Sequence, residues 1–597
     1  MSLEKYFRQE LDYLRELGKE IAKEKPYLAN FLSEQGSDPD VERLLEGFAF
    51  LSGNLRAKIE DQFPEFTHSL INMLWPNYLR PMPSMTIVEF TPNVKVTRSS
   101  DLVEKGTEIL SVPIKSANEN KTIQCRFQTC RDVWLNPFHL KDATVLNSNE
   151  KANISLEFSS ETLLNFKELD LDKLRLFFAA DEFTNQQLYL WFNYYLESAE
   201  ILINEQKIKL PEFSFEPVGF RKEDGLIPYP KNTYSGYRIL QEYFCFPESF
   251  FFFDSKGIGK LPTTEQSDKF TLNLTFSRPL SSDVRITATT FKLHCTPAIN
   301  LFQHHSEPIH LTGEKTEYPL KSSYQHSEWY EIFSVNGVEG YIENKDAQLQ
   351  RNQALKRSYA PFESFEHQIE YAKGRTELYY KIRIKEALLK QGFEYYISFV
   401  RGDETLLLNN KESISVNMTC TNREIPTYLK IGDVCVGTHK NPAVAQFRNI
   451  TRPSMPLHPI LDGTLAWKLI SNASLNYLSL LEIDALKEII KTYDFPSWHS
   501  KRNARISQKK LDAIKSIETI PIDRLFKNIS IRGLQSTLYL KQSEFHSEGE
   551  MYLFCTVLAQ FFSLYASVNS FHKLKVINLD TQESYEWPIQ LGQHSLM

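Results

Sequence analysis

The sequence contains no apolar stretch long enough to cross a membrane as a helix. Its most apolar run, Tyr243–Phe253, is interrupted by Pro247 and Glu248 and falls far short of the roughly 20 apolar residues that a spanning helix needs. The opening segment, MSLEKYFRQE, has no apolar core of the kind found in signal peptides. Together these two absences predict a soluble protein of the cytoplasm.

Cysteine is scarce, and neither sign of charge is in large excess. The seven cysteines are scattered and odd in number, so we expect reduced, buried thiols and no disulfide framework. The net charge of -7 results from 68 basic and 75 acidic residues, whereas nucleic-acid-binding proteins usually show a basic excess. The densest basic cluster, at Lys501, Arg502, Arg505, Lys509 and Lys510, is expected to be a solvated face. We therefore predict no nucleic-acid partner.

Motifs typical of catalytic, cofactor or metal sites are also absent from the sequence. Cys125 and Cys130 lack the second ligand pair of a zinc site, and on a strand they would point to opposite faces. The histidines and Cys295 between His294 and His310 show no ligand-binding spacing. Nucleotide loops, nucleophile elbows and EF-hand loops do not occur. We predict no catalytic, cofactor-binding or metal-binding residues and no small-molecule substrate.

What is present is the composition of a large folded protein. A chain of 597 residues with 42% hydrophobic and 24% charged residues predicts about three to five domains. Proline-rich segments and changes of hydrophobic period divide it into four parts. The predicted parts are a helical N-terminal domain (1–83), a first β-rich domain (84–305), a second β-rich domain (306–450) and an α-rich C-terminal domain (451–597).

Alternation of apolar and polar residues indicates most of the strands. It is found at Met85–Val96, Ile123–Phe127, Ile154–Phe158, Leu188–Phe192, Phe270–Phe276, Tyr379–Ile384 and Tyr395–Val400. Many strands with few helices between them favour antiparallel, sandwich-like regions. Helical spacing returns at Leu465–Leu486 and Leu511–Ile517, and Met551–Val568 is almost wholly apolar, as in a buried helix. The predicted fold class is α+β and multidomain.

The first predicted helix carries an apolar, partly aromatic stripe. Spacings of three, four and seven bring to this stripe Leu3, Tyr6, Phe7, Leu11, Leu14, Leu17 and Ile21. The stripe packs either within its own domain or on a partner, and the sequence leaves both readings open. A second helix is predicted from the N-cap Asp38 and Pro39 to Ile59. The proline-rich segment 75–83 then predicts an extended connector.

Longer blocks of sequence carry more information than these general patterns. In chain order they are Asp38–Leu51, Asp61–Glu65, Leu74–Met85, Gly236–Pro247, Cys295–Phe302, Cys420–Pro426 and Tyr552–Phe571. Together they closely resemble the TssF family, also called VasA or ImpG, a baseplate subunit of bacterial type VI secretion systems. One departure is Trp75-Pro-Asn-Tyr78, where the family more often has Tyr-Pro-His-Tyr. The aromatic residue before proline is kept.

The resemblance implies a structural role, with no catalytic site and no cofactor. It implies that two TssF copies join one TssG in a baseplate wedge, to which TssK and TssE attach around the VgrG spike hub. This baseplate would be recruited from the cytoplasm to the membrane complex and would start assembly of the tube and sheath. The N-terminal stripe is then the expected binding surface for TssG and the second TssF copy. Because one sequence must fill two non-equivalent places, a hinge is predicted near Pro81–Pro83.

Two functions of other classes were weighed against this one. A carbohydrate-active hydrolase built on β-sandwiches would need two acidic groups on either side of a cleft. A carbohydrate-binding or adhesion module would need an export signal, which the sequence does not show. A cleft with such a carboxylate pair, or an exposed apolar N-terminal surface, distinguishes the hydrolase from the scaffold.

Overall fold

The computed structural model divides into two compact units, which are described separately. The first comprises residues 1–79 and 460–473, and the second comprises residues 80–459 and 474–597. The residues that the structure describes are 7–8, 11, 13–15, 43–52, 71–72, 75–92, 100–115, 122–166, 169–229, 237–259, 261, 266–312, 315–322, 329–342, 355–362, 378–386, 392–401, 412–438, 445–460, 482–526, 529–566 and 570–592.

Helical backbone is present in the first unit at residues 43–52 and at several residues between 7 and 15. The short helix η2 (Pro76–Tyr78) follows the buried Trp75 and begins with a proline. Proline suits this first position because a backbone N–H there would have no hydrogen-bond partner within the helix. Most of the predicted domain 1–83 lies outside the described residues. The N-terminal helical region is therefore not shown as a whole and stays a prediction.

The second unit contains a six-stranded antiparallel sheet whose strands are widely separated in the sequence. The strand order is β26-β3-β6-β17-β1-β27, so β1 lies between a strand about 200 residues later and another near residue 447. The strands are β1 (Met85–Pro92), β3 (Glu108–Ser111), β6 (Arg126–Thr129), β17 (Cys295–Ile299), β26 (Val434–Gly437) and β27 (Ala445–Asn449).

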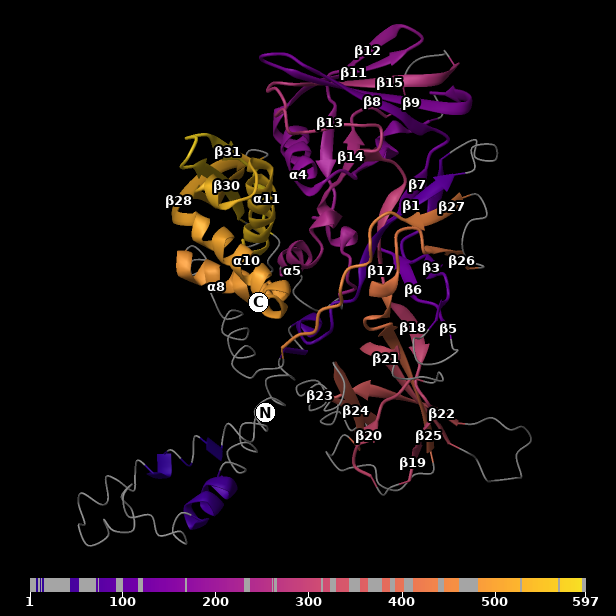
Figure 1. Cartoon of the computed structure of the whole chain (residues 1–597), viewed down its shortest axis with the longest axis vertical. Helices are drawn as coiled ribbons and strands as arrows, with labels where there is room; N and C mark the ends of the chain where they lie inside the picture. The colour runs from indigo at the N-terminus through magenta and orange to yellow at the C-terminus, as the bar shows by residue number, and fades with distance from the viewer. Residues whose placement is uncertain are drawn as a thin grey trace, which may run out of the picture. The chain divides into compact units, whose positions relative to one another are not determined.

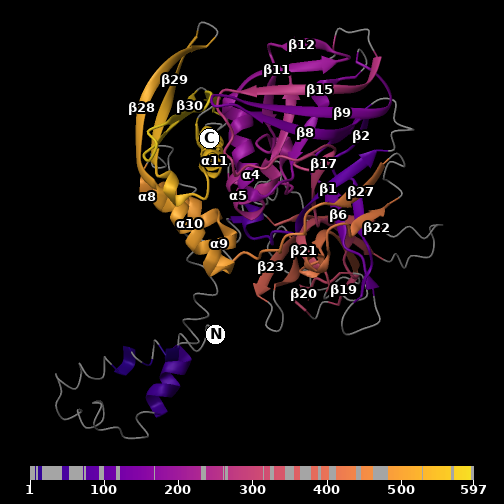
Figure 2. The ribbon, with the colours of Figure 1, turned by 45° about the horizontal axis from the view of Figure 1, so that its top comes forward.

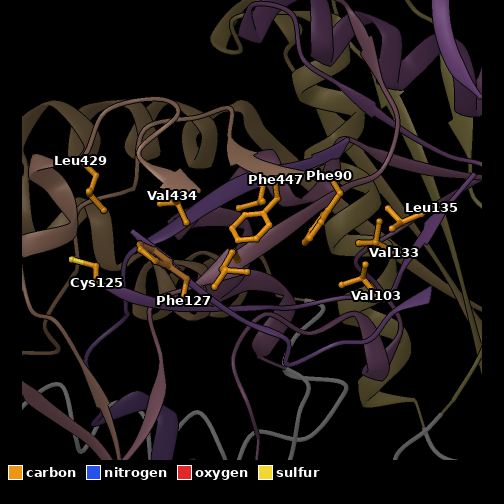
Figure 3. Close-up of a cluster of buried hydrophobic side chains, with 12 residues drawn as sticks. Phe90, Val103, Cys125, Phe127, Val133, Leu135, Leu429, Val434 and Phe447 are labelled. Atoms are coloured by element: carbon orange, nitrogen blue, oxygen red, sulfur yellow. The ribbon is translucent and has the colours of Figure 1, made fainter. Parts of the chain in front are cut away.

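An apolar cluster in this sheet joins the early and late strands (Figure 3). Phe90 of β1 packs on Phe447 of β27, with ring centroids 5.5 Å apart. Phe127 of β6 and Val434 of β26 are fully buried in the same cluster. Burial of these side chains supplies the driving force that holds the distant segments together.

Two smaller sheets follow β7 in the chain, with β11, β12 and β15 grouped near β8 and β9 (Figure 1). One has the order β12-β11-β15-β9-β8 and the other β13-β14-β10-β16. Their strands are β8 (His139–Asn147), β9 (Ala152–Asn165), β10 (Arg175–Phe178), β11 (Leu196–Ile203), β12 (Gln206–Leu210), β13 (Ser214–Pro217), β14 (Phe252–Lys256), β15 (Gln266–Phe276) and β16 (Phe291–Lys292). Two strand pairs complete this region: β2 (Asp101–Val103) with β7 (Val133–Leu135), and β4 (Ile114–Lys115) with β5 (Thr122–Ile123).

A further sheet is inserted between β17 and β26. Its strands are β18 (Phe302–His305), β19 (Ile309–Leu311), β20 (Tyr318–Pro319), β21 (Glu331–Ile342), β22 (Leu355–Pro361), β23 (Leu378–Glu386), β24 (Phe393–Arg401) and β25 (Glu412–Thr421). The chain enters and leaves this insert at one place, because the side chains of Asn300 and Asn422 are hydrogen-bonded at 2.8 Å and the backbone N–H of Asn422 donates to Asn300 Oδ1 at 2.7 Å. The strands predicted at Tyr379–Ile384 and Tyr395–Val400 are confirmed as parts of β23 and β24.

Residues 182–195 are helical, which corrects the strand predicted at Leu188–Phe192. The Asp181 side chain accepts the N–H of Thr184 and caps α4 (Glu182–Leu190), which continues as the π-helical turn η4 (Trp191–Tyr195). Most of α4 is buried. A helix buried on all sides has no apolar stripe, so a short run of it is indistinguishable from a buried strand in the sequence. A second helix of this region is α5 (Arg238–Cys245).

The C-terminal part of the second unit combines helices with a sheet. Its elements are α8 (Ile483–Tyr493), α9 (Phe495–His499), α10 (Lys501–Ala513), β28 (Ile514–Phe526), β29 (Ile529–Leu540), α11 (Glu548–Tyr565), β30 (Phe571–Asn578), β31 (Ser584–Glu586) and β32 (Gln590–Leu591). Figure 2 shows β28 and β29 as a long curved hairpin beside α11. The remaining short helices are η3 (Leu171–Lys173), η5 (Lys222–Asp224), η6 (Pro247–Phe250), η8 (Ile425–Tyr428) and η10 (Gln542–Glu544).

The helices near the C-terminus confirm one part of the predicted fold and correct another. The apolar helix predicted at Met551–Val568 is α11, which is buried along most of its length. The helix predicted at Leu511–Ile517 instead ends at Ala513, and Ile514 begins β28. The β-branched Ile514 and Ile517 favour a strand paired with β29. In the described ranges no helix, α11 included, has the length and apolarity to span a bilayer.

Candidate interaction surfaces

The structure describes three residues of the predicted N-terminal stripe. Leu11 is 8% exposed, and Phe7 and Leu14 are half-buried. The other stripe residues lie outside the described residues, and they are Leu3, Tyr6, Leu17 and Ile21. Burial of Leu11 within the isolated chain means that this position of the stripe is already covered by other residues of the chain. Binding of a partner by the stripe stays a prediction.

The second helical segment of the first unit presents an apolar face to solvent. Leu44, Phe48 and Leu51 are 74%, 61% and 62% exposed, and their spacing of four and three residues places them on one side of a helix. Ala49 of the same segment is fully buried, so the segment packs by its opposite side. Helical spacing in the sequence locates these residues but cannot tell which apolar residues the chain leaves uncovered.

The best-defined cavity in the described residues holds three carboxylates that are used in structural hydrogen bonds. The cavity, of about 170 Å³, is lined by the side chains of Asp132, Asp172 and Asp254, among others. Asp172 Oδ1 accepts the N–H groups of Ile258 and Gly259 at 2.9 and 3.0 Å. These hydrogen bonds connect Asp172 to the backbone at residues 258–259 and occupy Asp172 Oδ1 as an acceptor.

The other two carboxylates of the cavity, Asp254 and Asp132, also accept hydrogen bonds from the protein. Arg175 donates from Nε to Asp254 Oδ1 at 2.6 Å and from Nη2 to Asp254 Oδ2 at 2.9 Å, a bidentate geometry that fixes both groups. Asp132 Oδ1 accepts the backbone N–H of Lys105 at 2.7 Å. A glycosidase needs a carboxyl group that can give a proton and a second that can attack or activate water. The hydrogen bonds at this cavity instead hold strands and turns in place.

The histidines and cysteines singled out in the sequence are dispersed in the structure. Burial lowers the pKa of His294 and of His304 to about 4, so both rings are neutral at pH 7. Cys125 and Cys130 are buried free thiols whose pKa burial raises to about 12, which keeps them protonated and unreactive. Among the described residues no group of three or more His, Cys, Asp or Glu side chains is arranged to hold a metal ion.

Close packing joins the C-terminal helices to the rest of the second unit. α11 meets α4 so closely that a Cβ at Gly549 would lie 2.0 Å from the carbonyl oxygen of Gln186. The Ser547 side chain caps α11 by accepting the N–H of Glu550 and donates to Gln186 Oε1 at 2.6 Å. Glycine is required here because any side chain would separate the two backbones.

Buried ion pairs also stabilise the helices of this region. Lys510 of α10 reaches inward to Glu550 of α11 at 2.6 Å, and Arg238 pairs with Glu242 within α5 at 2.8 Å. Arg238 and Glu242 are 5% and 1% exposed, and Glu242 also accepts the backbone N–H of Leu226 at 2.9 Å. Removing one partner of such a pair would leave an uncompensated buried charge.

Comparisons with known proteins place the chain among components of the type VI secretion system. The solved structure of a TssK–TssF–TssG baseplate subcomplex contains a chain that is 29% identical, with a TM-score of 0.76, and the match covers 92% of this chain and 98% of that one. A second solved structure, of the baseplate complex from the type VI secretion system, contains a chain that is 26% identical over the full length of both, with a TM-score of 0.62.

Sequence comparison defines the family. The chain is 27% identical to the type VI secretion system component TssF1 of Pseudomonas aeruginosa over 98% of each protein. The family model for the type VI secretion system protein TssF matches residues 1–594. The chain therefore belongs to the TssF family, as the sequence blocks predicted.

Proposed function

We propose that the chain is a non-catalytic structural subunit of the type VI secretion baseplate wedge, in which two copies assemble with one TssG. The observation that carries the proposal is the family match over residues 1–594, joined to a similar chain within a TssK–TssF–TssG subcomplex. Proteins similar over their whole length and fold commonly keep the same assembly surfaces. TssG and TssK are therefore the partners best supported by the comparisons.

The wider role follows from the proposed place in the wedge. TssE and the VgrG spike hub are proposed as further neighbours, and the baseplate would start assembly of the tube and sheath. We place the protein in the cytoplasm, recruited to a baseplate docked at the inner membrane. The four-part domain division stays a prediction, and a hinge near Pro81–Pro83 is proposed for the two non-equivalent copies.

The exposed apolar face of residues 43–52 supports a partner in the first unit. Leu44, Phe48 and Leu51 would together bring three large apolar side chains into contact with a neighbouring subunit, as is typical of the core of an obligate interface. We propose that this face and the N-terminal stripe of Phe7, Leu11 and Leu14 form a helical bundle with TssG and the second TssF copy.

Co-purification with TssG tests this proposal. We expect two copies of the wild-type chain to form a complex with one TssG, and native mass spectrometry measures this composition. The variant Leu44→Asp, Phe48→Asp, Leu51→Asp should lose TssG, because burying three carboxylates without partners is strongly unfavourable. Circular dichroism should remain that of the wild type, since the replaced side chains are exposed in the isolated chain.

A matched control uses exposed leucines of the second unit. Leu146 and Leu163 are 70% and 65% exposed, and Leu146→Asp with Leu163→Asp should retain TssG. A variant of Phe7, Leu11 and Leu14 to Asp examines the predicted stripe separately, and it should also lose TssG. Full assembly of the Leu44, Phe48 and Leu51 variant with TssG would remove the 43–52 face from the interface. A wild-type chain that never binds TssG would refute the proposed function itself.

A further inference from the structure

The outer face of α10 carries four cations that have no ion-pair partner among the described residues. Lys501, Arg502, Arg505 and Lys509 are all exposed, and in the part of the chain that the structure describes none of the four forms an ion pair. We call these four residues the α10 basic face. The fifth cation of the helix, Lys510, points inward to Glu550 at 2.6 Å. Within the described part of the chain, α10 therefore has one paired cation on its inner side and four cations without an ion pair on its outer side.

This arrangement is unfavourable for an isolated helix. Arg502 and Arg505 are three residues apart and Arg505 and Lys509 are four apart, so each pair brings like charges together on the helix surface. Lys501 and Arg502 also lie in the first turn, which contains no acidic residue, and the partial positive charge of a helix N-terminus repels them. By contrast, the first turn of α11 carries Glu548 and Glu550, and that of α8 carries Asp484.

The basic face also differs in charge from the rest of the chain. Residues 501–513 contain five basic residues and one acidic residue, a net +4, whereas the whole chain is -7, so the remainder carries -11. Exposed lysines elsewhere are often paired, as Lys141 is with Glu157 at 2.9 Å and Lys151 with Glu197 at 2.6 Å. The α10 basic face is therefore a local concentration of positive charge on an acidic protein.

The helix that carries this face is held firmly. The Ser500 side chain caps its first turn by accepting the N–H of Asn503, and Leu511 and Ala513 are buried. Lys510 ties the inner side to α11 through Glu550, and α11 is packed on α4 at Gly549. Cations on an ordered element lose little freedom when they meet a partner, which favours binding.

We propose that the α10 basic face docks on a carboxylate-rich surface of a neighbouring protein subunit in the TssK–TssF–TssG type of complex. The proposal rests on the proposed function, because it requires such a neighbour. Arg502, Arg505 and Lys509 lie within eight residues, and the seven steps between the first and the last cover about 10 Å of helix, which fits acidic side chains on a single helix or strand. Two of the four cations are arginines, whose planar guanidinium groups pair with carboxylates through two hydrogen bonds.

A protein surface fits this face better than a lipid bilayer does. Helices that lie on membranes bury an apolar face in the bilayer and keep cations on the other side. The apolar side of α10 is instead packed inside the unit, and Ile506, 45% exposed, is the apolar residue that remains among its cations. The adjoining strand β28 exposes Glu518 and Asp523 together with Lys515 and Arg524, so it adds no net attraction for anionic lipids.

Charge reversal on α10 tests the proposal in the reconstituted complex of TssF, TssG and TssK from the same bacterium. In Arg502→Glu, Arg505→Glu, Lys509→Glu we expect assembly to weaken about tenfold or more at about 100 mM NaCl. Wild-type assembly should weaken as salt rises, and the variant should lose much of that dependence. The matched control, Lys207→Glu, Lys209→Glu, Lys269→Glu, changes the same charge on exposed positions of β12 and β15 and should assemble like the wild type.

Stability of the free subunit supplies an independent readout. Because Arg502→Gln, Arg505→Gln, Lys509→Gln removes like charges at spacings of three and four residues, this neutral variant should melt at or above the wild-type temperature. A purely structural role for these cations predicts a lower melting temperature and would overturn the proposal. If the reversed variant does not fold, this neutral variant replaces it in the assembly measurement, and weakened assembly is expected.

A photo-crosslinking residue at position 506 identifies what covers the face. Capture of a TssG or TssK peptide rich in Asp and Glu supports the proposal, and changing those acids to Lys should restore binding of the reversed variant. Capture of a peptide without acidic residues would overturn it. Salt-sensitive binding of the wild type to phosphatidylglycerol vesicles, lost in the reversed variant, would overturn it in favour of a membrane. If TssF fails to bind TssG, the proposed function fails, and crosslinking in intact cells still decides the partner of α10.

Discussion

His294 shows how one buried side chain makes the stability of the protein depend on pH. The ring is 6% exposed and its Nε2 accepts the backbone N–H of Asn136 at 3.0 Å, which requires an unprotonated nitrogen. Burial lowers the pKa of His294 to about 4. The folded protein therefore keeps the ring neutral over a range of pH in which the unfolded chain binds a proton.

The sign of the effect follows from linkage. Because the folded pKa lies below the ordinary value of about 6.5, the contribution to stability is complete above pH 6.5 and is lost as the pH falls toward 4. Between pH 6.5 and 5 the loss from His294 should be about 2 kcal/mol. In His294→Asn this part of the acid destabilisation should disappear, measured by urea unfolding at several pH values.

The choice of replacement and the other buried histidines both affect how the His294→Asn experiment is read. Asn is the replacement because residue 294 has a φ of 56°, a conformation that asparagine tolerates better than most residues. His304 and His572, whose pKa values burial lowers to about 4 and about 3, should still destabilise the variant in acid. The exposed His305→Asn serves as the control. An acid dependence identical in His294→Asn and in the wild type would contradict the assignment.

Packing between two helices is most sensitive at Gly549. In Gly549→Ala the added Cβ would lie 2.0 Å from the Gln186 carbonyl oxygen, so α4 and α11 must move apart. We expect the free energy of unfolding to fall by about 1–3 kcal/mol or more, seen by calorimetry as a lower melting temperature. Gly337→Ala, where nothing lies within 4 Å of the new Cβ, should be nearly neutral, and equal losses in both variants would refute this account.

The elements that the sequence predicted well are those whose pattern is local. β9 and β15 alternate between buried and partly exposed residues. α11 follows Ser547, whose side chain accepts the N–H of Glu550 in the Ser-x-x-Glu sequence pattern typical of a helix start. α4 was missed because burial on all sides removes its stripe. The start of β28 at Ile514 was missed because pairing with β29 overrides a short helical spacing.

The candidate surfaces were predictable only in part, for a physical reason. Helical spacing places Leu44, Phe48 and Leu51 on one side of a helix, but exposure depends on what the rest of the chain covers. The α10 basic face was visible in the sequence as charge, but the sequence could not show that its four cations have no ion-pair partner among the described residues. The contacts of the predicted hinge region were not predictable either. Met82 and Leu457 exchange two backbone hydrogen bonds of 2.7 and 3.0 Å, and no local sequence pattern indicates a contact between residues so far apart in the chain.

The whole molecule depends on strands that return late in the chain. β26 and β27 complete the sheet of β1, and Leu429, Val434 and Phe447 complete its apolar cluster. We expect a fragment of residues 80–305 to aggregate, because it would expose that cluster. Replacing Phe302–Thr421 by a short Gly-Ser linker should instead preserve the sheet, since Asn300 and Asn422 already meet at 2.8 Å.

Size-exclusion chromatography and thermal unfolding check both expectations. The shortened chain should elute as one species with a cooperative transition, whereas the 80–305 fragment should elute in the void volume. The opposite ranking, with a well-folded fragment and an aggregated shortened chain, would show that the six-stranded sheet does not need its late strands. A linker chain that keeps the sheet would also allow the inserted strands to be exchanged without disturbing the frame.

The inserted sheet also sets an order of events during synthesis. The hydroxyl of Thr86 is held by Thr451, 365 positions later, and a ribosome adding about 5–20 residues per second takes roughly 20–70 seconds to cover that distance. Throughout that interval β1 lacks its late neighbour, while the intervening strands emerge complete and can fold first. For roughly 20–70 seconds the nascent chain must therefore carry β1 without its neighbour β27, an interval in which the open edge of β1 is available to a chaperone.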